Sequence, residues 1–236
     1  MSEPSAEAPA PCGRGPAEYA RANERRRMVD TQLRGRDITD VAVLDAMASV
    51  PRHAFVPEAD QRRAYDDMPL PIGFDQTISQ PYIVAFMTQA LRLGPRDRVL
   101  EIGTGCGYQS AVLARLAGHV YSVELVQPLA QRARATLDAL GCTNVDVRVG
   151  DGFEGWAAHA PYDRIIVTAA PEEMPRALLD QLAVGGVIAI PVGRDEQVLR
   201  VLRKTPEGME TLATLPVRFV PMRSSGPPSG ERGHAG

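Results

Sequence analysis

Three glycines at alternate positions directly follow an apolar run and are the residues best suited to bind a ligand. Gly103, Gly105 and Gly107 come after the run Val99–Ile102 and before a segment with helical apolar spacing. A strand, a glycine turn and a helix bring bare backbone and a helix N-terminus close to a nucleotide-like ligand. A dinucleotide fingerprint requires a third glycine at the position of Tyr108. The pattern therefore favours an adenosine-bearing ligand without a pyrophosphate.

Three acidic residues follow the same order as the predicted strands. Glu101 lies in the first predicted strand, Glu124 ends the second, and Asp151 follows the third. Parallel strands present their carboxyl ends at one edge of a sheet, where ligands bind. An acid ending the second strand can accept hydrogen bonds from both ribose hydroxyls, and Asp151 can reach an adenine amino group. Together with the glycine loop, the three acids indicate an adenosine site.

A polar segment upstream of the glycine loop is a second candidate site. Gln76, Thr77 and Ser79 precede Pro81, which suits the first turn of a helix. Free N–H groups at a helix N-terminus favour an anion. An N-cap role is the commonest use of serine there, and on pattern alone it is the preferred interpretation of Ser79. The prolines and glycine within residues 66–79 predict neither a regular helix nor a regular strand.

The alternation of strand and helix patterns predicts the fold that positions these residues. Helices covering both faces of a parallel sheet are typical of such a pattern. We expect an α/β protein with a doubly wound, mostly parallel Rossmann-like sheet, an antiparallel closing pair and an N-terminal helical segment. The expected strands are 99–102, 119–124, 145–149, 162–168 and 187–193, the closing pair is 198–203 and 209–220, and the expected helices are 17–35, 41–49, 81–93, 109–116, 128–140 and 175–182.

Length and composition predict one domain. The 236 residues are 44% hydrophobic, enough for a full core. Residues 1–16 and 224–236 are rich in Pro, Gly, Ala and Ser, and we expect a disordered arm and tail. Between them, 17–223 forms a single domain, with a helical and lid part at 17–95 and a cofactor-binding core at 96–223.

Charge and cysteine usage limit the partners and the compartment. With a net charge of −3, the chain has no broad positive electrostatic potential that would attract a nucleic acid, so a nucleic-acid substrate is not favoured. Cys12, Cys106 and Cys142 are widely spaced, without a C-x-x-C pair for zinc or redox chemistry, and reduced thiols are the preferred interpretation. No apolar run has the length of a membrane span, and Met1 is not followed by a signal-sequence pattern. We expect a cytoplasmic, monomeric protein without a metal.

Several motifs resemble those of class I S-adenosylmethionine-dependent methyltransferases. They are Glu101–Tyr108, Glu124 and Gly150–Gly152. More narrowly, Leu70–Pro81 is similar to the segment typical of protein-L-isoaspartate O-methyltransferases. The similarity extends in order over roughly residues 20 to 222. Residues 167–171, 185–186, 191–193 and 217–221 also agree with the sequence pattern of this family. The tail after Met222 matches no pattern of the family.

The resemblance implies a repair enzyme that methylates the free α-carboxylate of L-isoaspartyl residues in damaged proteins and peptides. It implies S-adenosyl-L-methionine as cofactor and a catalytic Ser79 that positions the acceptor carboxylate, which overrides the N-cap preference. Backbone near Val220 is expected to help bind the substrate peptide. The implied cofactor-binding residues are Gln76, Thr77, Ile78, Glu101, Gly103, Thr104, Gly105, Gly107, Tyr108, Glu124, Leu125, Asp151 and Gly152.

Three other hypotheses stay open at this point. The first is a methyltransferase with a small-molecule or RNA acceptor, and only the similarity of Leu70–Pro81 to the isoaspartate family argues against it. An oxidoreductase using a nicotinamide cofactor is disfavoured by Tyr108 at the third fingerprint position. A non-catalytic adenosine-binding module is the last alternative.

Overall fold

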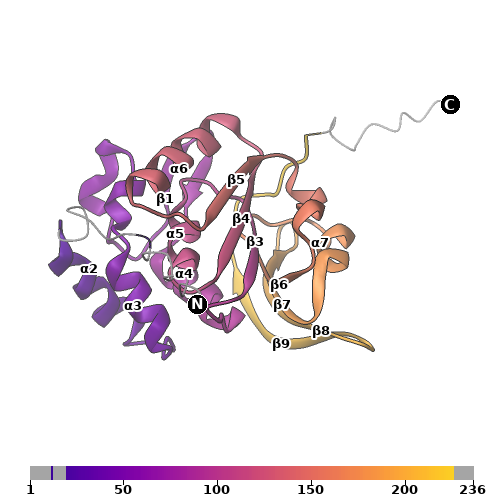
Figure 1. Cartoon of the computed structure of the whole chain (residues 1–236). Coiled ribbons are helices and arrows are strands. Elements are labelled where there is room, and N and C mark those ends of the chain that lie inside the picture. The colour runs from indigo at the N-terminus through magenta and orange to yellow at the C-terminus, as the bar shows by residue number, and fades with distance from the viewer. Residues whose placement is uncertain (1–11, 13–19, 226–236) are drawn as a thin grey trace, which may run out of the picture.

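The computed structural model describes residue 12 and residues 20–225, which contain a seven-stranded sheet in the order β5-β4-β3-β6-β7-β8-β9 (Figure 1). Strands β5, β4, β3, β6 and β7 run parallel, and β8 and β9 continue the sheet antiparallel. This confirms the predicted doubly wound sheet and its closing pair. The strands are β3 (Arg98–Ile102), β4 (His119–Glu124), β5 (Val145–Val149), β6 (Tyr162–Val167), β7 (Leu182–Val192), β8 (Gln197–Thr205) and β9 (Gly208–Val217).

Helices cover both faces of the sheet because strand residues alternate between two apolar clusters. Val99 of β3 packs into the cluster that contains α4 (Pro81–Leu91), α5 (Tyr108–Ala114) and α6 (Gln127–Ala139). Its neighbour Leu100 packs into the cluster on the opposite face, beneath α7 (Arg176–Gln181). Figure 1 shows α4, α5 and α6 on one side of the strands and α7 on the other. The short 3-10 helices η4 (Gly152–Glu154) and η5 (Ala157–His159) precede β6.

The N-terminal helical segment packs on the α4–α5 side (Figure 1). It contains α2 (Ala22–Met28), the π-helix η1 (Val29–Leu33), α3 (Val41–Ser49) and the 3-10 helices η2 (Arg52–Phe55) and η3 (Glu58–Arg63). Asp40 is the N-cap of α3, since its Oδ1 atom accepts hydrogen bonds from the backbone N–H groups of Ala42 and Val43 at 2.9 and 3.3 Å. The predicted start of the first helix at residue 17 lies outside the described residues.

Residues 70–78 form an antiparallel hairpin, so the expectation of no regular strand there was wrong. Strands β1 (Leu70–Gly73) and β2 (Gln76–Ile78) pair around Phe74 and Asp75. Both turn residues have positive φ, 56° and 58°, as in the tight turns that match the twist of a hairpin. The sequence signal was weak because such turns usually contain Asn-Gly rather than Phe-Asp.

Two terminal contacts correct the expectations about the ends of the chain. Cys12 and Cys142 form a disulfide, so the interpretation of all three cysteines as free thiols was wrong; Cys106 is free. Ser224 and Ser225 hydrogen-bond to Asp151, so the folded part extends beyond the expected boundary at 223. The rest of the expected arm and tail lies outside the described residues. Within residues 20–225, no helix is long and apolar enough to cross a membrane.

Candidate functional site

A cleft opens at the carboxyl ends of the central parallel strands and, open solvent included, encloses about 860 Å³. The structure brings together twelve of the predicted residues as its lining: Gln76, Thr77, Ile78, Ser79, Gly103, Thr104, Gly105, Tyr108, Glu124, Leu125, Gly152 and Val220. Glu101, Gly107 and Asp151 do not line it, although each contacts or adjoins a residue that does.

The glycine loop exposes backbone to the cleft because neighbouring groups leave no room for side chains. A Cβ on Gly103 would lie 2.4 Å from the Thr168 Oγ1 atom, and the φ of Gly103 is 92°. The Thr168 hydroxyl donates to the carbonyl of Gly103 at 2.7 Å and so joins the loop to the end of β6. Gly107, at the N-cap of α5, also has a φ of 92° and faces Ala133 of α6. Both glycines are therefore required by geometry.

Glu124 holds the loop at the end of β4. Its Oε2 atom accepts a hydrogen bond from the Gly105 backbone N–H at 2.7 Å, and its Oε1 atom accepts one from Val126 at 2.9 Å. The side chain is buried, yet it lines the cleft. A carboxylate offers about four lone-pair sites, so two acceptor sites stay available to ligand hydroxyls.

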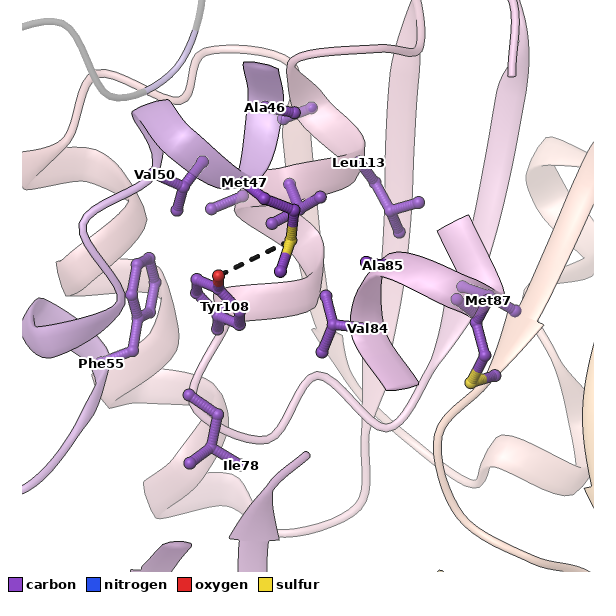
Figure 2. Packing of buried hydrophobic residues seen from close by; sticks show 14 of the residues in the cluster. Ala46, Met47, Val50, Phe55, Ile78, Val84, Ala85, Met87, Tyr108 and Leu113 are labelled. Atoms are coloured by element: carbon purple, nitrogen blue, oxygen red, sulfur yellow. Dashed lines mark hydrogen bonds between the residues drawn. The ribbon is translucent and has the colours of Figure 1, made fainter. Parts of the chain in front are cut away.

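Tyr108 anchors the loop to the N-terminal helices. Figure 2 shows its ring among apolar side chains, with its hydroxyl directed at Met47; the oxygen–sulfur distance is 3.7 Å. The Phe55 ring lies edge-on to the Tyr108 ring, with 5.6 Å between the ring centroids. The Arg52 guanidinium lies 4.9 Å from the Tyr108 ring centroid. The side chain that replaces the third fingerprint glycine is therefore anchored in the core at the point where it lines the cleft.

Glu101 lies behind the loop, where it is fully buried. Its Oε2 atom accepts hydrogen bonds from Ser110 of α5 and from Ser122 of β4, the latter at 2.6 Å. The Ser122 hydroxyl also contacts the Thr104 hydroxyl at 2.6 Å, and Thr104 lines the cleft. Glu101 is therefore placed to support the loop through serine hydroxyls. Its assignment as a direct cofactor ligand stays a prediction.

Burial raises the pKa of Glu101 to about 7, against the opposing effect of its two serine donors. The folded state therefore binds this proton more tightly than the unfolded state. Protonation stabilises the fold fully below the unfolded pKa of 4.5, and this contribution is lost as the pH rises through about 7. At ~1.4 kcal/mol per pKa unit, the loss is on the order of 3 kcal/mol.

We expect Glu101→Gln to remove this part of the pH dependence, because a neutral amide replaces the titrating group. Urea unfolding of both proteins at several pH values between 4.5 and 8 provides the measurement. The free energy of unfolding of the parent chain should fall relative to that of Glu101→Gln as the pH rises. Parallel curves for the two proteins would contradict a titrating Glu101.

Ser79 lines the cleft but does not cap α4, so its N-cap interpretation was wrong. The N-cap of α4 is Gln80, and no side chain makes the capping bond. No other group in the described part of the chain forms a hydrogen bond with the Ser79 hydroxyl. A half-buried hydroxyl that faces a cleft and supports no secondary structure is available to a ligand.

The hairpin that leads to Ser79 is fixed to α6. Arg132 of α6 donates from Nη2 to the carbonyl of Ile72 at 2.6 Å, and its guanidinium lies 5.7 Å from the Phe74 ring centroid. Helix α6 begins three residues after Glu124. A single helix thus connects the acid at the end of β4 with the hairpin that precedes Ser79.

The structure adds cleft residues that sequence reasoning missed. Most come from elements next to the predicted motifs, and the C-terminal ones are the last residue of the matching segment 217–221 and the two residues that follow it. Pairing of Ala170 with Pro221 brings that segment to the cleft, a contact between residues 51 positions apart. The additional lining residues are Val84, Ile102, Cys106, Gln109, Val123, Val126, Thr168, Ala169, Pro221, Met222 and Arg223.

The sheet order, the glycine loop and the acid ending β4 together define an α/β protein that binds a nucleoside-bearing cofactor at the carboxyl edge of its sheet. The family model for protein-L-isoaspartate(D-aspartate) O-methyltransferase matches residues 23–226. The chain therefore belongs to this family of methyltransferases.

Curated relatives and solved structures support this family membership. The chain is 57% identical over 209 residues to the protein-L-isoaspartate O-methyltransferase of Synechococcus sp., covering 85% of this chain and 86% of that protein. It is 57% identical over 213 residues to that of Opitutus terrae, covering 89% and 91%. A solved protein-L-isoaspartate O-methyltransferase superposes with a TM-score of 0.76 at 28% identity, covering 83% of this chain and 65% of that one.

Proposed function

We propose that this cleft transfers a methyl group from S-adenosyl-L-methionine to the free α-carboxylate of L-isoaspartyl residues in damaged proteins and peptides. The observation that carries the proposal is the Ser79 hydroxyl, which lines the same cleft as the glycine loop and Glu124. Membership in the family and 57% identity to named relatives support the activity. A Plasmodium falciparum member of the family, 24% identical with a TM-score of 0.71, was solved in complex with S-adenosyl-L-homocysteine.

The residues of the cleft fit this cofactor. Backbone is bare at Gly103 and Gly105, and a side chain at Gly103 would collide with Thr168. Glu124 keeps acceptor sites for the two ribose hydroxyls after its bonds to the loop. Leu125 and Gly152 follow β4 and β5 and line the same cleft as Glu124. The bound cofactor would supply a methyl group on a positively charged sulfur.

Ser79 is assigned to the acceptor. Its hydroxyl can donate to one carboxylate oxygen and hold the other oxygen toward the glycine loop. A carboxylate with a pKa of about 3.5–4 is already ionised at neutral pH, so no base is needed to activate it. Within the described chain, no histidine lines the cleft. Catalysis then rests on orientation and on the exclusion of water.

The proposed transfer is tested with methyl-labelled S-adenosyl-L-methionine and a protein aged to accumulate isoaspartate. A carboxyl methyl ester hydrolyses in base and releases labelled methanol. We expect base-labile label on the aged protein and far less on the same protein freshly prepared. Base-stable label, or equal labelling of both preparations, would contradict the proposed acceptor.

Two alternatives make different predictions. A methyltransferase acting on RNA or a small molecule would label neither protein preparation, although it would still bind S-adenosyl-L-homocysteine. An oxidoreductase would bind NAD more tightly than S-adenosyl-L-homocysteine, which equilibrium titration measures directly. The core position of the Tyr108 ring and the absence of a third fingerprint glycine argue against the second alternative.

We also propose that the chain works as a monomer in the cytoplasm, on protein and peptide substrates rather than nucleic acid. The net charge of −3 supports the exclusion of nucleic acid. The disulfide between Cys12 and Cys142 opposes the cytoplasmic part of this proposal, because such bonds are rare in reducing compartments. Alkylation of intact cells before lysis tests the compartment. Three alkylated cysteines agree with the cytoplasm, and alkylation of Cys106 alone would contradict it.

A further inference from the structure

The segment 219–225, here called the C-terminal strap, is fixed across the carboxyl edge of the sheet at three points. Gln197 of β8 bonds to both backbone groups of Phe219, at 2.5 and 3.1 Å. Ala170 pairs with the strap on either side of Pro221, through bonds to Val220 and Met222 of 2.9 and 2.8 Å. The third point is Asp151, beyond the end of β5. The strap is therefore part of the wall of the cleft.

The third attachment concentrates hydrogen-bond donors on one oxygen of Asp151. Its Oδ2 atom accepts from the Ser224 hydroxyl at 2.6 Å, the Ser225 N–H at 2.8 Å and the Ser225 hydroxyl at 3.0 Å. Its Oδ1 atom accepts only from the Phe153 N–H, at 2.9 Å. Because an oxygen of a carboxylate has two lone-pair sites, Oδ2 is saturated and Oδ1 keeps one free.

Asp151, the residue predicted from the sequence to reach an adenine amino group, lies beside the cleft without lining it. Gly152, its neighbour, lines the cleft, and a Cβ on Gly152 would lie 2.9 Å from the Met222 methyl carbon of the strap. Partial burial pushes the pKa of Asp151 up, but the bonds from Ser224, Ser225 and Phe153 outweigh it and lower this pKa. The carboxylate therefore stays ionised and acts only as an acceptor at neutral pH.

We propose that Ser224 and Ser225 are positioning residues that direct the free lone pair of Asp151 Oδ1 to the adenine amino group, and thereby select adenine over a 6-oxo purine. The inference rests on the proposed cofactor. An amino group donates to the carboxylate, whereas a carbonyl oxygen at the same position of the purine would face it as a second acceptor. Rotation of Asp151 after loss of the serine donors would remove this discrimination.

The test compares S-adenosyl-L-homocysteine with S-inosyl-L-homocysteine, its 6-oxo analogue, by isothermal titration. The full chain should bind the adenosyl compound far more tightly. We expect Ser224→Ala/Ser225→Ala to raise the Kd of the adenosyl compound roughly tenfold, as loss of hydrogen bonds to a charged group does. The Kd of the inosyl compound should change little. Ser224→Thr/Ser225→Thr, which retains both hydroxyls, should restore selectivity, and Ser49→Ala on α3 serves as the matched serine control.

Three results would overturn the inference. Equal weakening of both ligands would mean that the strap is only a wall of the cleft. Tighter binding of the adenosyl compound by the double variant would mean that the serines compete with adenine for Asp151. Unchanged selectivity in Asp151→Asn, which keeps the side-chain shape, would remove Asp151 from recognition. If the parent chain binds neither compound, the proposed cofactor itself fails, and thermal melting of each variant separates these results from misfolding.

Discussion

Replacing Ser79 with alanine is expected to lower the rate of methyl transfer by roughly 10- to 100-fold, because a hydrogen bond to a charged group contributes about 1.5–3 kcal/mol. The affinity for S-adenosyl-L-homocysteine should change much less, since the hydroxyl is assigned to the acceptor. Stability should be nearly unchanged, because Gln80 rather than Ser79 occupies the N-cap of α4. Initial rates per folded molecule, together with thermal melting, measure these effects.

Ser79→Thr is the control, since it keeps a hydroxyl on Cβ. We expect it to recover part of the rate lost in Ser79→Ala. The contrary outcome is a melting temperature that falls while activity per folded molecule holds. Ser79 would then have a structural role, and the acceptor would have to be bound by other groups of the cleft.

The second large effect concerns Glu124. Glu124→Ala should weaken cofactor binding by about 1–3 kcal/mol, or roughly 5- to 150-fold in Kd, because a charged acceptor of hydrogen bonds is lost. Part of this loss comes from the loop, since Glu124 also accepts from the N–H groups of Gly105 and Val126. Titration with S-adenosyl-L-homocysteine measures the total.

A ligand without the 2′-hydroxyl separates the two roles of Glu124. The parent chain should bind the 2′-deoxy analogue of S-adenosyl-L-homocysteine more weakly than S-adenosyl-L-homocysteine itself. In Glu124→Ala this difference should largely disappear, because the partner of the hydroxyl is gone. An undiminished preference for the ribose form in the variant would assign the hydroxyls to another group and leave Glu124 as a loop support alone.

Much of the fold was predictable because local patterns agreed with the tertiary structure. The strand Val145–Val149 and the helix Val41–Ser49 were predicted with the bounds that the structure has. Buried parallel strands are short apolar runs between helices, and such runs can be recognised from the local sequence without knowledge of long-range contacts. The loop at Gly103 was equally clear because glycine there is required by the nearby Thr168 side chain.

The features that sequence reasoning missed depend on contacts between distant residues. The β1–β2 hairpin turns at Phe74 and Asp75, and a positive φ is unusual for a bulky residue such as Phe74. Asp151 and Ser224 are 73 residues apart, and nothing local predicts their hydrogen bond. The partnership of Cys12 with Cys142 spans 130 residues. Such contacts follow from topology, and spacing in the sequence does not encode them.

Identical peptides that differ only by aspartate or L-isoaspartate at one position provide the most direct measurement of the proposed reaction. Each peptide is incubated with the full chain and methyl-labelled S-adenosyl-L-methionine, and base-labile label is counted. We expect label on the isoaspartyl peptide and background on its aspartyl twin. Equal labelling of the twins, or label on neither peptide from a chain that binds S-adenosyl-L-homocysteine, would contradict the proposed reaction.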